Sequence, residues 1–342
     1  MTKSRFNLPV PFGWYAVYMA SELVRGDVKP LYYFEQDLVL FRTESGAARV
    51  LDAMCPHLGA HIGHGGKVHG ESVACPFHGW EYNGDGVCTK VPYAEKIPPK
   101  VADGHPCMKS YPVKEMNGVI WAWYHPQGID PLFEIEEIPE LDDRDNWSEP
   151  TIQEWEVNAP LQETGENAVD KAHFEFVHGI NEMPASEITV DGFTRSTEMD
   201  VRSASYDEEG NRNPNELMDR KITTINIGPG YSLQSFIGIT DIRMLGTITP
   251  ITRDKVFLRF ITVIGNDISQ TSEVIAQAML DNLRIQVEQD IPIWNHKKYQ
   301  EKPILCDGDG PIMQYRKWFS QFYPQRGSAS VPCRATQQDT RG

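Results

Sequence analysis

The sequence lacks any long apolar run and any excess of positive charge. No stretch of about 18 apolar residues occurs in its 342 residues, and the N-terminal segment has no apolar run of the signal-peptide type. Aspartate and glutamate (48) outnumber lysine and arginine (32), so the formal net charge of -16 repels the phosphate backbone of nucleic acids. We therefore expect a soluble, cytoplasmic protein with no membrane span and no nucleic-acid partner.

Cysteine is also scarce. Six cysteines in a chain of this length are too few for a disulfide scaffold, and in a reducing compartment a group of them indicates metal binding or catalysis. The length predicts two domains. An acidic, proline-containing segment begins after residue 126, as a linker would. We predict a first domain over residues 1–126, whose first residues could pack on the second domain, and a second domain over residues 127–342.

Both domains contain strand patterns, and the second also contains helices. Segments 31–43 and 118–126 are short, β-branched and aromatic and are bounded by turn residues, which predicts an all-β first domain. Segments 221–229, 231–251 and 255–265 are typical of antiparallel strands, and two helical stretches flank them in the sequence. The predicted fold class is therefore α+β, with an all-β domain followed by an antiparallel sheet and flanking helices.

One stretch of the first domain combines cysteine with histidine. Cys55-Pro-His57 is followed after seventeen residues by Cys75-Pro-Phe-His78, so each arm has one thiolate and one imidazole. Structural zinc also uses such ligands, but its arms usually separate them by about two to four residues and do not mix the two types. Mixed arms suit a 2Fe-2S cluster in which both cysteines bind one iron and both histidines the other, the Rieske arrangement. We predict Cys55, His57, Cys75 and His78 as cluster ligands, with structural zinc as the alternative.

The other histidines and cysteines need no ligand role. His61, His64 and His69 lie in the same stretch, but a Rieske cluster already has its ligands, so we interpret them as loop or surface residues. The remaining cysteines show no partner spacing and are interpreted as free thiols: Cys88, Cys107, Cys306 and Cys333.

A second group of candidate residues lies in the first helical stretch of the second domain. Glu166, Asp170 and His173 are spaced i, i+4 and i+7, which puts them on one face of a continuous helix. His178 lies about 140° further round an undistorted helix, so it can share a metal with His173 only if the helix bulges or ends between them. Gly179 is a plausible helix stop. The alternative is two histidines near a helix end, one buried and one solvated.

The second helical stretch, residues 271–299, offers a third ligand. Asp290 lies on its apolar stripe, where a carboxylate is costly unless it is paired or bound to a metal, whereas Glu288 is rotated away from the stripe. Pro292 is expected to kink the helix beside Asp290. The alternative is a buried salt bridge from Asp290 to one of two cations, Arg284 or Lys298.

His173, His178 and Asp290 together would form a 2-His-1-carboxylate triad. Such a triad leaves coordination positions open, which suits ferrous iron that binds dioxygen beside a substrate. The predicted Rieske cluster would then be the electron store for this iron, so each predicted metal site supports the other.

These motifs resemble those of the oxygenase components of Rieske non-haem iron oxygenases, over essentially the whole chain. The stretch ENAVDKAHFEFVH, residues 166–178, is similar to the family's iron motif, and the resemblance implies His173 and His178 as iron ligands. It implies Asp170 as the catalytic acid that bridges the iron to His78 of the partner subunit in a ring-shaped homotrimer. It also implies a START-like, helix-grip catalytic domain behind the Rieske domain.

The C-terminal part narrows the resemblance. Residues 288–324 are similar to 3-ketosteroid 9α-hydroxylase oxygenase components and to cholesterol 7-desaturases, and the aligned QDIPIW supports Asp290 as the carboxylate ligand. The resemblance implies a monooxygenase that uses dioxygen to hydroxylate or desaturate a steroid or a similar large apolar ring substrate. Electrons would come from NAD(P)H through a flavin reductase, with or without a ferredoxin.

Three other functions stay open at this point. An oxygenase of the same chemistry could hydroxylate or demethylate an aromatic acid or amine, and for an acid a buried cation facing the substrate is expected. An electron-transfer Rieske protein with a lipid-binding domain would have no iron outside its cluster, and a zinc-stabilised interaction module would be colourless. Lysines near the Rieske loops could receive an acidic ferredoxin, although a merely solvated face explains them more simply: Lys67, Lys90, Lys96 and Lys100.

Overall fold

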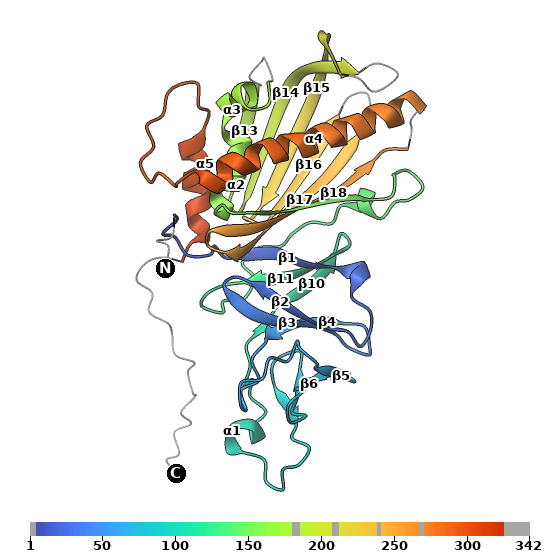
Figure 1. The fold of residues 1–342 in the computed structure, drawn as a ribbon, viewed down its shortest axis with the longest axis vertical. Coiled ribbons are helices and arrows are strands. Elements are labelled where there is room, and N and C mark those ends of the chain that lie inside the picture. Colours follow the sequence, from blue (N-terminus) through green and yellow to red (C-terminus); the bar gives the residue numbers. More distant parts are fainter. Residues whose placement is uncertain (1–4, 180–184, 207–211, 238–240, 267–269, 325–342) are drawn as a thin grey trace.

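The computed structural model describes residues 5–179, 185–206, 212–237, 241–266 and 270–324. Figure 1 shows an elongated molecule in three tiers, with a helix-covered sheet at one end and a small sheet at the other. A run of short strands precedes a large antiparallel sheet with helices, so the predicted α+β class is confirmed. None of the described helices is long and apolar enough to cross a membrane.

The middle tier consists of two antiparallel sheets, with the strand orders β1-β11-β10 and β2-β3-β4-β9. Strand β11 is buried along its whole length because its residues, VIWAWY, are all apolar or aromatic. The elements of this tier are β1 (Gly13–Met19), η1 (Ala20–Glu22), β2 (Val28–Tyr33), β3 (Gln36–Arg42), β4 (Ala48–Asp52), β9 (Ser110–Tyr111), β10 (Val113–Met116) and β11 (Val119–Tyr124).

The small sheet at the lower end of Figure 1 has the order β5-β6-β7-β8. Its hydrophobic core, which includes Ile62, Trp80 and Tyr82 and residues of β3 and β4, is separate from the main core of the molecule. We call this sheet, with its connecting loops and a short helix, the distal lobe. Its elements are β5 (Lys67–His69), β6 (Ser72–Ala74), β7 (Glu81–Asn83), β8 (Cys88–Lys90) and α1 (Pro99–Ala102).

The upper tier is a seven-stranded antiparallel sheet with the order β12-β18-β17-β16-β15-β14-β13, and the long helix α4 crosses one of its faces (Figure 1). Met279 and Leu283 of α4 pack against Phe236, Ile242 and Met244 of the sheet. The strands are β12 (Thr151–Val157), β13 (Ala185–Asp191), β14 (Thr194–Tyr206), β15 (Arg212–Ile227), β16 (Tyr231–Ile237), β17 (Ile242–Thr252) and β18 (Lys255–Ile264). The helices are η2 (Pro139–Leu141), α2 (Leu161–Glu166), η3 (Asn167–Val169), α3 (Lys171–Phe176), α4 (Gln270–His296), α5 (Ile312–Phe319) and η4 (Ser320–Phe322).

The upper and middle tiers share one hydrophobic core. Trp121 of β11 packs on Tyr231 of β16 with ring centroids 5.8 Å apart, and the hydroxyl of Thr249 donates to the carbonyl of Ala16 at 2.7 Å. These contacts fix the two tiers against each other, while the domain boundary at residue 126 stays a prediction.

Candidate metal centres

Two loops of the distal lobe form the same hydrogen-bonded turn. In the first, the Cys55 amide donates to the carbonyl of Ala60 (2.9 Å) and the Gly59 amide donates back to the carbonyl of Cys55 (2.8 Å). In the second, the Cys75 amide donates to the carbonyl five residues later (2.8 Å) and the Gly79 amide donates back (2.9 Å). Gly59 and Gly79 close the turns with φ values of 77° and 70°, in the left-handed region that favours glycine. The two turns therefore have the same backbone hydrogen bonds, although the histidine is two residues after the cysteine in the first turn and three residues after it in the second.

The turns bring the predicted cluster ligands together. The rings of His57 and His78 have centroids 4.8 Å apart, and His57 stacks on Trp80 at 4.5 Å. Among the described residues, the buried Nδ1 atoms of both histidines have no hydrogen-bond partner, and Cys55 and Cys75 are buried free thiols. Burial raises the pKa of the Cys55 thiol, so a thiolate there requires a nearby cation. The two cysteine sulfurs and the two unpartnered histidine nitrogens fit a metal cluster that binds both sulfur and nitrogen ligands.

The other histidines and cysteines of the first domain have other neighbours, and their lack of a ligand role stays a prediction. The rings of His61 and His64 are tilted against each other with centroids 4.5 Å apart, and Nδ1 of His69 is 3.0 Å from Oε1 of Glu81. The free thiols in the described part of the chain include Cys88, Cys107 and Cys306, whereas Cys333 lies outside the described residues.

The second centre joins the end of α3 to α4. The ligand atoms of His173, His178 and Asp290 all lie within 4.8 Å of one another. Nε2 of His178 is 3.4 Å from Oδ2 of Asp290, whose residue is only 5% exposed. Arg284, which the sequence offered as an alternative partner of Asp290, pairs with Glu288 at 2.9 Å instead. The structure therefore brings together the three residues that the sequence predicts at one metal site.

The chain path before this centre differs from the predicted continuous helix. Helix α2 ends at Glu166, the chain passes through η3, and Asp170 is extended (φ -78°, ψ 100°) as the N-cap of α3, where its carboxylate accepts from the His173 amide at 3.4 Å. The prediction that Glu166, Asp170 and His173 share one helix face is wrong, because an aspartate that caps a new helix cannot continue the old one. Glu166 pairs with Arg316 at 2.6 Å. Helix α3 ends at Phe176, between His173 and His178, which meets the condition for the two histidines to share a metal and places the end before the expected stop at Gly179.

Hydrogen bonds to Nδ1 orient both imidazoles of this centre. Nδ1 of His173 lies 2.5 Å from the carbonyl oxygen of Asp170, and Nδ1 of His178 lies 3.0 Å from Oε1 of Gln289. Both partners are acceptors, so each Nδ1 carries the hydrogen and donates it outward. Each Nε2 then presents its lone pair to the centre, which is the usual arrangement of a histidine that binds a metal.

Two amide side chains of this centre escaped prediction. Nδ2 of Asn167 donates to Oδ2 of Asp290 (2.9 Å) and lies 3.1 Å from Nε2 of His173, so it bridges two of the candidate ligands. Gln289 orients His178. An amide has no charge, and neither residue stands out by spacing, so the only sequence signal for Gln289 is its position beside Asp290.

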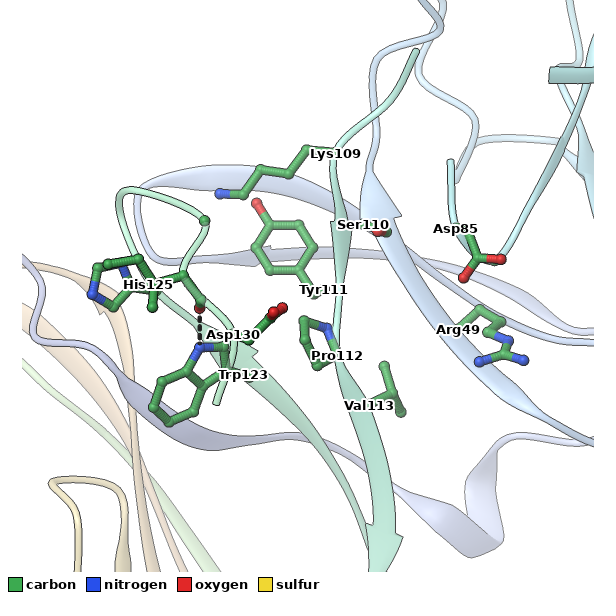
Figure 2. Close-up of a pocket in the computed structure, with 13 residues that line it drawn as sticks. Arg49, Asp85, Lys109, Ser110, Tyr111, Pro112, Val113, Trp123, His125 and Asp130 are labelled. Atoms are coloured by element: carbon green, nitrogen blue, oxygen red, sulfur yellow. Dashed lines mark hydrogen bonds between the residues drawn. The ribbon is translucent and has the colours of Figure 1, made fainter. Parts of the chain in front are cut away.

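A cavity of about 300 Å³ lies between the middle tier and the β7–β8 turn of the distal lobe (Figure 2). Figure 2 shows Lys109, Tyr111 and His125 on one side of it and Arg49 and Asp85 on the other. Burial lowers the pKa of His125, and the charge of Lys109 acts in the same direction, so further positive charge is disfavoured there. The cavity is lined by none of the predicted site residues, so the candidate chemistry lies elsewhere.

Comparison with known families gives two matches that together cover most of the chain. Residues 13–112 match the Rieske 2Fe-2S domain, which contains the cysteine and histidine loops. Residues 122–323, which include the second centre, match the 3-ketosteroid 9alpha-hydroxylase C-terminal domain. The first match supports a 2Fe-2S cluster over structural zinc.

Individual relatives agree with these matches. The chain is 32% identical to cholesterol 7-desaturase nvd of Xenopus laevis, over 92% of this chain and 72% of that protein. It is also 32% identical to the oxygenase component of 3-ketosteroid-9-alpha-monooxygenase of Rhodococcus rhodochrous, over 91% of this chain and 83% of that protein.

Solved structures share the fold at lower identity. Dicamba monooxygenase bound to dicamba superposes with a TM-score of 0.70 at 17% identity, covering 92% of this chain and 98% of that one. NdmA of Pseudomonas putida CBB5 with caffeine superposes with a TM-score of 0.71 at 19% identity, covering 90% and 89%. The resemblance drawn from the motifs is confirmed: the chain belongs to the Rieske oxygenases, an enzyme family, and within it to those with a 3-ketosteroid 9α-hydroxylase C-terminal domain.

Proposed function

We propose that the protein is the terminal oxygenase component of a Rieske monooxygenase that hydroxylates or desaturates a steroid or a similar large apolar ring substrate, within lipid metabolism. In hydroxylation, dioxygen, two electrons and two protons convert a C–H bond to C–OH and release water. The observation that carries the proposal is the presence of two different donor sets in one chain, Cys2His2 in the distal lobe and His2Asp beside α4. The steroid-acting names of both relatives support the substrate class.

We assign the cluster to Cys55, His57, Cys75 and His78. The unpartnered Nδ1 atoms support coordination through Nδ1, and Trp80, stacked flat on His57, holds that ring in place. A 2Fe-2S cluster supplies single electrons, and a ferrous iron supplies a site where dioxygen is activated.

We assign the ferrous iron to His173, His178 and Asp290. Both histidines point Nε2 inward, and Asp290 is buried and free of any lysine or arginine partner among the described residues, so the three offer two neutral nitrogens and one negative oxygen. Gln289 and a backbone carbonyl keep the two rings in the required orientation. The amide of Asn167 has to turn aside when a cation takes the lone pairs that it now contacts.

We further propose a homotrimer in which the distal lobe of one subunit docks beside α3 of the next. The two centres lie in opposite end tiers of one chain (Figure 1). Exposed apolar side chains flank both: Leu58 (65% exposed) and Phe77 (61%) beside the cluster ligands, and Phe176 (83%) beside the iron ligands. In a head-to-tail ring these surfaces would cover each other. Asp170, at the start of α3, would then bridge the iron to His78 of the partner subunit.

Electrons are proposed to come from NAD(P)H through a flavin reductase, with or without a ferredoxin. Lys67, Lys96 and Lys100 are exposed on the distal lobe and are candidates for docking an acidic donor. Lys90 is also exposed but pairs with Glu81 at 3.2 Å, which makes it less available.

An anaerobic iron and acid-labile sulfide assay, with an absorption spectrum and a titration with 4-androstene-3,17-dione, tests the proposal. We expect about three irons and about two sulfides per chain, with a steroid-dependent change at the ferrous site. About two irons would indicate an electron-transfer protein instead. Three irons without a steroid response would direct the search to aromatic acids or amines, and zinc without sulfide would overturn the assignment of both centres.

A further inference from the structure

Arg195 is a buried cation without a carboxylate partner in the described part of the chain. It lies on β14, is only 2% exposed, and its Nη2 atom has no hydrogen-bond partner among the described residues. Nη1 of Arg195 makes a long hydrogen bond to Oδ1 of Asn226 at 3.4 Å, and the guanidinium carbon lies 5.7 Å from the ring centroid of Tyr315. Burial lowers the pKa of Arg195, which reflects the cost of keeping its charge there.

The other well-buried arginines of the described chain are paired. Arg42 binds Glu115 at 2.8 Å, Arg259 binds Glu154 at 2.6 Å, and Arg316 makes two bonds to a carboxylate of α2, at 2.6 and 2.8 Å. An unpaired buried charge destabilises the folded chain, so the missing partner of Arg195 needs an explanation that packing alone does not give.

Arg195 lines a small cavity of about 10 Å³. Thr197, two residues further along β14, lines the same cavity, is 5% exposed and also has an unpartnered side-chain oxygen, Oγ1. A volume of this size holds roughly one water-sized group. The cavity therefore offers a guanidinium N–H and a hydroxyl to a single oxygen atom.

The cavity lies next to the second metal centre. Its walls include Val169 of η3 and Phe174 of α3. Val169 is two residues after Asn167, which contacts the His173 ring, and Phe174 directly follows His173. Strand pairing puts Arg195 opposite Asn226, and the same row of paired residues continues across the sheet through Ser232 and Gly246 to Phe260. Paired residues share a face, so Arg195 lies on the face where Phe260 packs toward α4. The unpaired cation is thus in the same layer as the candidate iron ligands, between the sheet and the helices.

We propose that Arg195 and Thr197 bind an acceptor oxygen of the substrate, a ketone or a carboxylate, and so select and orient it at the iron centre. The proposal rests on the proposed oxygenase function and adds a chemical requirement to it, namely an oxygen on the ring system away from the carbon that is oxidised. Phe174 and Met199, which line the cavity and are only half-buried, are the side chains that must move for a ring to reach the guanidinium.

Binding to the anaerobic holoenzyme without reductant tests this inference apart from turnover. The probes are 4-androstene-3,17-dione, the hydrocarbon 5α-androstane with the same rings and no oxygen, and a steroid acid, 3-oxochol-4-en-24-oic acid. We expect Arg195→Met to weaken binding of the two oxygenated probes by about 10- to 100-fold and to leave 5α-androstane unchanged. A larger loss for the acid than for the dione identifies a carboxylate as the preferred group, and an equal loss identifies the ketone.

Two further variants and a control separate this role from a structural one. Thr197→Val is expected to weaken the dione several-fold, and Arg195→Lys, which keeps the charge, to restore part of the binding lost in Arg195→Met. Arg259→Met removes a buried arginine from the other face of the same sheet and is expected to leave all three affinities unchanged. The ligand-free unfolding temperature of Arg195→Met should equal or exceed that of the wild type, because an unpaired buried charge is removed.

The outcomes distinguish this inference from the proposed function. Wild-type binding of the dione with an unchanged affinity in Arg195→Met would leave the steroid oxygenase intact and overturn the role of Arg195, whose cavity would then hold only water. Benzoate is added as a fourth probe, an aromatic acid without steroid rings. If the wild type binds benzoate but no steroid, and Arg195→Met loses this binding, the role of Arg195 is retained and the steroid substrate is overturned. Equal losses for the dione and 5α-androstane would show a packing defect, and no binding of any probe to the wild type would overturn both.

Discussion

The two candidate metal centres are built in opposite ways. In the distal lobe, both histidine Nδ1 atoms are buried without a partner among the described residues, and the loops that hold them are short turns close together in the sequence. Beside α4, Asn167 contacts His173 and Asp290, Asp290 lies 3.4 Å from His178, and this aspartate comes from a helix far along the chain. The polar ligand atoms of the first site thus need a bound cluster as their partner, whereas those of the second site already have hydrogen-bond or ionic partners within the protein.

The largest effect should come from a cluster ligand. His57→Ala is expected to abolish the cluster absorption, acid-labile sulfide and turnover, and to lower the unfolding temperature of the distal lobe, since cluster binding stabilises the folded loops. His64→Ala, an exposed histidine of the same stretch, is the matched control and should retain all of these properties. Normal sulfide content in His57→Ala would remove His57 from the ligand set.

Loss of the second site should be more selective. Asp290→Ala is expected to abolish turnover and to lower the iron content from about three to about two per chain, with the cluster spectrum and the unfolding temperature nearly unchanged. Glu288→Ala on the same helix removes an exposed carboxylate that pairs with Arg284 and should keep all of its iron. A fall in sulfide content in Asp290→Ala would show that the two centres are not independent.

The link between the centres can be tested without removing either. Asp170→Asn keeps a good N-cap for α3, so the helix should be as stable as in the wild type, whereas Asp170→Ala should cost about 1 kcal/mol of stability. Both variants should retain their full iron and sulfide content and lose turnover. Rapid-mixing absorption would show a reduced cluster that no longer reoxidises in the presence of dioxygen and substrate. Turnover in Asp170→Asn would reject the bridging role.

The smallest expected effect concerns the orientation of one imidazole. Gln289→Leu removes the acceptor for Nδ1 of His178 and should weaken ferrous iron binding by about 10- to 100-fold, as loss of a hydrogen bond to a metal-binding histidine usually does. Competition with a chelator measures the affinity. Gln286→Leu, one turn earlier on α4, breaks a local bond to Asn282 and should leave the affinity unchanged. Equal affinities in both variants would mean that packing alone orients His178.

The sequence predicts the cluster site more completely than the second site, because the ligands of the first are close together in the sequence and those of the second are not. The cluster loops are local, so the spacing of Cys55 to His78 carries nearly all the information. Asp290 can be found because a carboxylate on an apolar stripe violates the helical pattern. The break at Asp170 cannot be read in this way, because a capping aspartate and an aspartate inside a helix have the same spacing.

Residues that act through tertiary contacts leave still less signal. Asn167 and Gln289 are polar residues in polar surroundings of the sequence, and only the folded chain places them against ligand atoms. Arg195 follows a glycine turn on a strand whose two faces are not clearly distinguished by hydrophobicity. The side chain of Arg195 lies on the inner face because of the register between β14 and β15, and the residue pattern of one strand does not determine that register.

The separate hydrophobic core of the distal lobe affects how the chain opens. The upper and middle tiers share one core, so neither can open without the other, but the lobe packs mainly on itself and on the two central strands of the neighbouring sheet, β3 and β4. It can therefore behave as a foldon that opens and recloses while the remainder keeps its amide protons protected from exchange. Opening of the lobe alone would expose the cysteine and histidine loops to solvent without unfolding the sheet and helices that hold His173, His178 and Asp290.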